Sequence, residues 1–186
     1  PSGLIGVWKN LATEPSRKGS SEPFLLTFLQ IPVDKHQTFC YNDNMKKIIL
    51  VDADGVLLNW EYAFDIYLQQ HGFSKVEGAE FEYDIGKRYG IDREQGKRLI
   101  KIFNESAAIG FLPPHRDAMF YVKRLHEEHG FIFHCITSLS KDKNAQELRK
   151  MNLRKLFGET AFEKFVFLDT GADKDEVLDK YRDTSY

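Results

Sequence analysis

The chain has 186 residues, of which 42% are hydrophobic, and its formal net charge is −2 at pH 7. This length and apolar content are sufficient for the core of one domain with a small insertion. The near-neutral charge, with both signs mixed along the chain, argues against non-specific binding to a polymeric nucleic acid, which requires a basic surface, but it leaves a single nucleotide open as a ligand.

Cysteine content and hydropathy indicate the cellular compartment in which the protein resides. Cys40 and Cys135 lie far apart and have no metal-binding spacing. They predict no disulfide framework, and a reducing cytoplasm is the simplest location. No apolar run approaches the roughly 20 residues needed to span a bilayer, so we expect no membrane partner. The sequence carries no signal of an oligomeric state.

Residues 1–44 carry no sustained helical or strand periodicity. They contain Pro15, Pro23 and Pro32 together with a serine-rich run, which is typical of irregular structure. Met45 stands directly before the first strong strand pattern. We therefore interpret Met45 as the natural start and residues 1–44 as a leader outside the domain. The alternative is an N-terminal arm docked on the core.

Residues 48–51 form an unbroken apolar run that ends in Asp52-Ala53-Asp54-Gly55. Such a run predicts a strand buried on both faces, most often in a parallel sheet. Two carboxylates at its carboxyl end lie where open α/β sheets bind ligands, and Gly55 allows the chain to turn tightly. The simpler alternative is a polar Asp-Gly turn, which needs only one aspartate.

The stretch IILVDADGV, residues 48–56, resembles motif I of the haloacid dehalogenase (HAD) superfamily. The resemblance implies that Asp52 is the nucleophile of an aspartyl-phosphate mechanism and that Asp54 is the general acid/base. It also implies a Mg²⁺ cofactor held by Asp52 and Asp54, which offsets the negative charge of the carboxylates and the phosphate. Backbone amides after Asp52, with Gly55 among them, would bind the substrate.

Helical patterns follow at residues 60–71, around 83–89 and at 92–106. The buried face of the last is predicted to consist of three apolar side chains, Leu99, Ile102 and Phe103. By the resemblance, residues 60–112 form a small helical cap inserted after the first strand, which contributes substrate specificity. The alternative is that these helices belong to the core itself.

Residues 115–129 predict a helix, with a core stripe of four side chains, Ala118, Met119, Val122 and Leu125. Residues 131–136 predict a second buried strand, which ends in Thr137-Ser138. Thr-Ser after a strand is by itself a weak pattern, usually a helix N-cap. Because it follows DADGV in order, it fits HAD motif II. That implies that Thr137 hydrogen-bonds the transferring phosphoryl group and that Ser138 is a second donor.

Residues 141–157 predict a helix capped by Ser140, and residues 164–168 a third strand. A further helix is expected from Asp173 to Lys180. Lys174 falls in its first turn, where a cation opposes the helix dipole.

The HAD resemblance implies a reason for that lysine, because motif III of the family is a lysine at the start of such a helix. Lys174 would then hold the nucleophile and phosphate charges together. Lys141 and Lys143 are the competing candidates, and a solvated surface lysine is the simplest alternative for all three.

The alternation of strands and helices predicts an α/β fold. By the resemblance it is a HAD-like Rossmannoid, a doubly wound parallel sheet built from residues 45–59 and 113–186. The acidic residues of the fourth family motif would complete the Mg²⁺ site. We expect them beyond Tyr186, so that the core is truncated at its C-terminus.

The implied function is Mg²⁺-dependent hydrolysis of a small phosphorylated substrate. The compact cap and the Ile136-Thr137-Ser138 sequence resemble the 5′(3′)-deoxyribonucleotidase-like branch, which makes a nucleoside monophosphate the first candidate and a sugar phosphate the second. The competing class is a non-catalytic HAD-fold binding module with an incomplete metal site.

Overall fold

The computed structural model describes residues 6–7 and 47–182. The chain divides into two units, one formed by residues 1–10 and 46–186 and the other by residues 11–45. Apart from residues 6–7, the predicted leader lies outside the described residues, as does the predicted start at Met45. Within the described part of the chain, no helix is long and apolar enough to cross a membrane.

A parallel sheet of four strands, in the order β1-β2-β3-β4, is the centre of the structure. Its strands are β1 (Gly6–Val7), β2 (Lys47–Val51), β3 (Phe131–Ser138) and β4 (Phe162–Leu168). The three longer strands were predicted. β3 runs through Thr137 and Ser138 because these residues still pair with Phe167 and Leu168 of β4.

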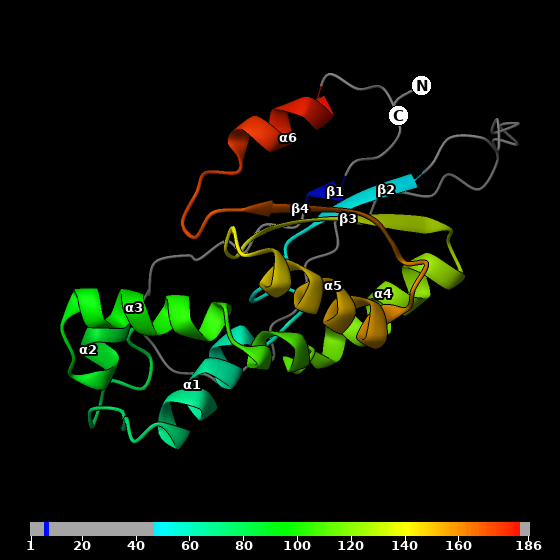
Figure 1. The fold of residues 1–186 in the computed structure, drawn as a ribbon. Helices are drawn as coiled ribbons and strands as arrows, with labels where there is room; N and C mark the ends of the chain where they lie inside the picture. The colour runs from blue at the N-terminus through cyan, green and yellow to red at the C-terminus, as the bar shows by residue number, and fades with distance from the viewer. Residues whose placement is uncertain (1–5, 8–46, 183–186) are drawn as a thin grey trace, which may run out of the picture. The chain divides into compact units, whose positions relative to one another are not determined.

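Helices cover both faces of this sheet. Helices α4 (Arg116–Glu127) and α5 (Lys143–Phe157) lie on one face, and α6 (Asp175–Arg182) lies on the other (Figure 1). Alternate residues of a strand point to opposite faces. Accordingly, Ile49 and Val51 of β2 join the core on the α4 and α5 side, whereas Ile48 and Leu50 pack with Tyr181 of α6. The predicted α/β class with a parallel sheet is confirmed.

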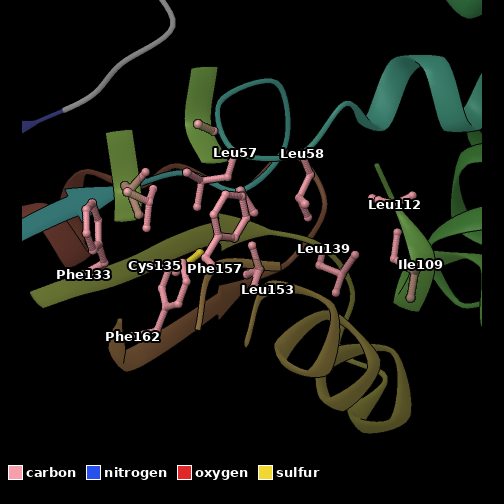
Figure 2. Packing of buried hydrophobic residues seen from close by; sticks show 14 of the residues in the cluster. Leu57, Leu58, Ile109, Leu112, Phe133, Cys135, Leu139, Leu153, Phe157 and Phe162 are labelled. Atoms are coloured by element: carbon pink, nitrogen blue, oxygen red, sulfur yellow. The ribbon is translucent and has the colours of Figure 1, made fainter. Parts of the chain in front are cut away.

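The larger core cluster fills the space between the sheet and helix α5. Figure 2 shows Phe133 and Cys135 of β3 in this cluster together with Leu153 and Phe157 of α5. Leu57, which follows β2 by a few residues, is part of the same cluster. The turn that carries Asp52 and Asp54 is therefore anchored in the core by its own apolar residues.

Residues 60–112, the predicted cap, contain three α-helices and a 3₁₀ helix. They are α1 (Trp60–Gln70), α2 (Ile85–Tyr89), α3 (Arg93–Asn104) and η1 (Ala107–Phe111). The two ends of this segment are hydrogen-bonded together. Asn59 N donates to Pro113 O at 2.8 Å, and His115 N donates to Leu57 O at 2.9 Å. The segment, called the excursion below, thus leaves the sheet and returns to it at one place. Its buried side chains, among them Phe64 and Phe103, belong to the same hydrophobic cluster as the sheet residues.

Aromatic packing joins α1 to α3. The ring of Phe103 lies 5.3 Å from that of Phe64 and 5.6 Å from that of Trp60, measured between centroids. The indole of Trp60 also donates from Nε1 to Asn104 Oδ1 at 2.8 Å. Aromatic pairs at such distances contribute beyond the area they bury, so this cluster is the main apolar support of the excursion.

A partly buried ionic network joins α1 to α2. Arg88 is buried and contacts Glu61, and its Nη1 lies 3.7 Å from Asp65 Oδ1. Tyr89 donates its hydroxyl proton to Asp65 Oδ1 at 2.5 Å. Burial and this hydrogen bond raise the pKa of Tyr89, so its hydroxyl stays protonated and remains a donor over the ordinary pH range.

Three details of the helices were predicted wrongly. Ile102 and Met119 are 53% and 43% exposed, because α3 packs through Phe103 and α4 packs through Ala118 and Val122. Helix α5 begins at Lys143 and not at residue 141, since its N-cap is Asp142, which accepts a hydrogen bond from Ala145 N at 2.7 Å. Ser140 is not the cap.

The aromatic cluster gives a stability prediction. Phe103→Ala removes a fully buried ring and should lower the free energy of unfolding by about 3–5 kcal/mol, through lost burial and a residual cavity. The control is Ile102→Ala at the neighbouring, half-exposed position, which should cost only about 0.5 kcal/mol. Urea unfolding with an unchanged m-value measures both. Equal losses in the two variants would contradict this packing.

Candidate active site

Asp52 is the first residue after β2, at the carboxyl edge of the sheet. Its Oδ1 accepts a hydrogen bond from Ala53 N at 2.7 Å, and its Oδ2 is paired with Nζ of Lys174. Both side chains are partly exposed, 30% for Asp52 and 27% for Lys174. A carboxylate with both oxygens engaged is fixed in orientation while it remains open to a ligand.

Lys174 is placed by the start of α6. Its carbonyl oxygen accepts hydrogen bonds from Val177 N at 3.1 Å and from Leu178 N at 2.9 Å. Lys174 therefore directly precedes α6, and its carbonyl group closes the first turn of that helix. Its side chain reaches back to Asp52, which lies 122 positions earlier in the chain. The unfavourable place of a cation at a helix N-terminus is offset by this carboxylate.

The other two lysine candidates lie elsewhere. Lys141 is 83% exposed and pairs with Asp169 Oδ2 at 3.1 Å. Lys143 is the exposed first residue of α5. Among these three lysines, Lys174 is the one whose side chain contacts Asp52 in the described structure.

Asp54 belongs to a tight turn that follows β2. Ala53 O accepts hydrogen bonds from both Leu57 N and Leu58 N at 2.9 Å, and Gly55 N donates to Leu58 O at 2.9 Å. Gly55 has φ of 73°, a conformation that glycine adopts without strain. The N–H of Gly55 is engaged within the turn. The role of Gly55 in this structure is therefore to shape the turn, and its amide is not a free donor for a substrate.

Arg149 of α5 is the partner of Asp54 and was not predicted as a site residue. Its Nη1 contacts Asp54 Oδ1, and its Nη2 lies 3.4 Å from Asp54 Oδ2. The Arg149 side chain is fully buried. One signal for it was present in the sequence, because position 149 falls on the same helical face as the buried residues Ala145, Asn152 and Leu153.

The environment of Asp54 changes its protonation. A quarter of its side-chain surface, 25%, is exposed, yet burial of the carboxyl raises its pKa above the ordinary value, with the charge of Asp52 adding to the rise and Arg149 opposing it. A carboxyl with a raised pKa retains a proton to higher pH. That is the property required of a general acid.

Thr137 and Ser138 end β3 beside this turn. Val51 pairs with Cys135 in the parallel register, so the residues that follow Val51 and Cys135 reach the same edge of the sheet. The hydroxyl of Thr137 is buried and has no hydrogen-bond partner within the described structure. Buried polar groups are nearly always paired, so this hydroxyl is suited to a ligand oxygen. Ser138, the next residue, is partly buried.

The loop after β3 is tied to α3. Ser140 Oγ donates to Glu105 Oε1 at 2.6 Å and accepts from Asp142 N at 3.1 Å. Glu105 is the C-cap residue of α3. Lys101 and Ser140 together hold the pKa of Glu105 below its usual range, so Glu105 remains a charged acceptor. The segment beside the candidate site is therefore connected to the excursion of residues 60–112.

The carboxylates at this edge match a magnesium ion in part. Mg²⁺ prefers oxygen donors and commonly binds through one or two carboxylates, with substrate phosphate and water supplying the rest. The Asp52 carboxylate and the backbone carbonyl of Asp54 fit that donor set, since both side-chain oxygens of Asp54 face Arg149. Within residues 47–182, His, Cys, Asp and Glu form no cluster of three or more that could hold a metal ion.

Comparison with known proteins gives a relative without a stated activity. No protein-family model matches the chain. Over 145 residues, 75% of this chain, the sequence is 30% identical to a protein of Enterobacteria phage T4 described as an uncharacterized 32.4 kDa protein in the Gp30-rIII intergenic region. The chain spans about half, 51%, of the length of that relative. The function must therefore be argued from the site.

The unpaired hydroxyl of Thr137 gives a second prediction. Thr137→Val keeps the side-chain shape and removes a buried polar group without a partner, so it should raise the free energy of unfolding by about 1 kcal/mol. Ser140→Ala is the control, because it removes a hydroxyl that is hydrogen-bonded, and it should lower that free energy by about 1 kcal/mol. Thermal melts in phosphate-free buffer measure both. Destabilisation by the two changes alike would show that the Thr137 hydroxyl has a partner.

Proposed function

We propose that this chain is a phosphomonoester hydrolase of the HAD type, with a HAD-like Rossmannoid fold, that works through an aspartyl-phosphate intermediate. The observation that carries the proposal is the pairing at the end of β2, where Asp52 contacts Lys174 and Asp54 contacts Arg149. Two carboxylates with separate cationic partners can take two different roles in one reaction.

The first role is that of the nucleophile. The Asp52 carboxylate is partly exposed and is oriented by Lys174 and by Ala53 N. In the first step a carboxylate oxygen of Asp52 forms a bond to phosphorus as the bond from phosphorus to the leaving oxygen breaks. The ammonium group of Lys174 lies where it can offset the charge of Asp52 and of the phosphoryl oxygens during this step.

The second role is that of the general acid and base. Asp54 gives its proton to the leaving oxygen in the first step. In the second step it takes a proton from the water that attacks phosphorus, and the bond from phosphorus to Asp52 breaks to release phosphate. The raised pKa of Asp54 supports its protonated state at the start of this cycle.

Other groups complete the proposed site. The hydroxyl of Thr137, which is buried without a partner in the described structure, would donate to a phosphoryl oxygen, with Ser138 as a second donor. A Mg²⁺ ion bound through the Asp52 carboxylate and the backbone carbonyl of Asp54 would supply charge neutralisation for the phosphate. The nearest substrate class is a nucleoside monophosphate, on the strength of the Thr137-Ser138 pair, and a sugar phosphate is the second candidate.

The nucleophile assignment is tested with Asp52→Asn. Asparagine keeps the shape of the side chain but is a poor nucleophile toward phosphorus, so hydrolysis of p-nitrophenyl phosphate in the presence of Mg²⁺ should fall to the uncatalysed rate. The far-ultraviolet circular dichroism spectrum should stay that of the parent. Hydrolysis at the parental rate would remove Asp52 from the mechanism. A parent that binds phosphate without hydrolysing any phosphomonoester would favour the non-catalytic binding module.

The lysine assignment is tested with a matched pair. Lys174→Met removes the cation that contacts Asp52 and should lower kcat by about 10²–10³-fold, as the loss of one charge-stabilising donor does elsewhere. Lys141→Met removes an exposed cation paired with Asp169 and should leave kcat nearly unchanged. Steady-state rates with the same aryl phosphate measure both. A larger loss in the Lys141 variant would transfer the role to Lys141.

A further inference from the structure

Arg149 is a fully buried cation in a helix whose other buried residues, Asn152 apart, are apolar. Taking a guanidinium out of water is costly, and well-packed apolar residues in place of a buried ion pair are often neutral or stabilising. Stability alone is therefore a weak reason for an arginine at this position. Positions that break a local packing rule are frequently functional.

The contact between Arg149 and Asp54 has two points. Nη1 faces Oδ1 and Nη2 faces Oδ2, the latter at 3.4 Å. A planar guanidinium that meets both oxygens of a carboxylate fixes its plane as well as its position, which a lysine ammonium cannot do. The turn hydrogen bonds fix only the backbone around Asp54. The orientation of the carboxyl group is therefore set by Arg149.

We propose that Arg149 is the positioning residue of the general acid/base, holding the Asp54 carboxyl in the orientation that reaches the leaving oxygen. The inference rests on the proposed function. Because the Arg149 side chain is fully buried, it acts through Asp54 and not as a direct ligand of the substrate. Misplacement of a catalytic group by a small distance is sufficient to cost much of its effect.

The arrangement also separates the two carboxylates. Arg149 approaches from α5, on one face of the sheet, and Lys174 approaches from the start of α6, on the other face. Each cation thus pairs with a different aspartate. The nucleophile and the acid/base are oriented independently, so a change at Arg149 should impair proton transfer without removing the nucleophile.

The test compares two substrates that differ in their need for an acid. 2,4-Dinitrophenyl phosphate releases a stabilised anion and needs little proton donation, whereas glycerol 2-phosphate releases an alkoxide that must be protonated. We would measure kcat/KM with Mg²⁺ for both, since this quantity reports phosphoryl transfer to Asp52. Arg149→Met should lower kcat/KM by about 10²-fold for glycerol 2-phosphate and leave that for the dinitrophenyl ester nearly unchanged. Arg149→Lys should give a smaller effect in the same direction.

The matched control is Asn152→Ala, one turn along the same helix. Asn152 is buried and donates from Nδ2 to Leu112 O at 3.1 Å, away from Asp54. The loss of this side chain disturbs α5 and should change kcat/KM for both substrates by the same factor. Equal falls in kcat/KM for both substrates in the Arg149 variants, or no fall for either substrate, would overturn the inference while the proposed function stands. A parent inactive on both would overturn the proposed function and this inference together. If Arg149→Met fails to fold, the ratio of the kcat/KM values for the two substrates, measured with Arg149→Lys, decides between these outcomes.

Discussion

A parallel strand covered on both faces offers polar groups few positions other than its ends, and this constraint organises the structure. Four residues of β2 are buried, two toward α4 and α5 and two toward α6. The first charged side chain that follows them, Asp52, marks the point at which the chain leaves the sheet. Because β3 is parallel and in register with β2, its own polar end at Thr137 reaches the same edge. The candidate site follows from that geometry.

Two carboxylates in one short turn would repel each other and any anionic substrate, so the pairing of each with a cation matters as much as their presence. Lys174 and Arg149 come from helices on opposite faces of the sheet, and together they match the charge of Asp52 and Asp54. Opposite charges at hydrogen-bond distance attract strongly when they are partly desolvated, so each pair fixes the position of its carboxylate.

The strands, the long helices and the turn at Asp52 could be predicted because each has a local signal, either an apolar run or a helical stripe. Ile102 and Met119 were misplaced because a helix with apolar residues on adjacent positions does not reveal which one faces its neighbour. Arg149 was missed for a related reason. It stands beside Lys150 and close to Glu147 in a largely charged stretch, and its burial depends on a partner 95 positions away. The engagement of the Gly55 amide depends on the detailed turn geometry, which residue types alone do not specify.

The connection between the excursion of residues 60–112 and the sheet has a physical consequence for the site. Residues 57–59 and 113–115 are joined by backbone hydrogen bonds and form a paired base. Beyond this base, Glu105 at the end of α3 accepts a hydrogen bond from Ser140, three residues after Thr137. A rotation of α1 to α3 about the paired base would break that bond and leave the hydroxyl proton of the buried Ser140 without its acceptor. The position of the excursion and the conformation of the loop after β3 are therefore linked through one charge-assisted hydrogen bond.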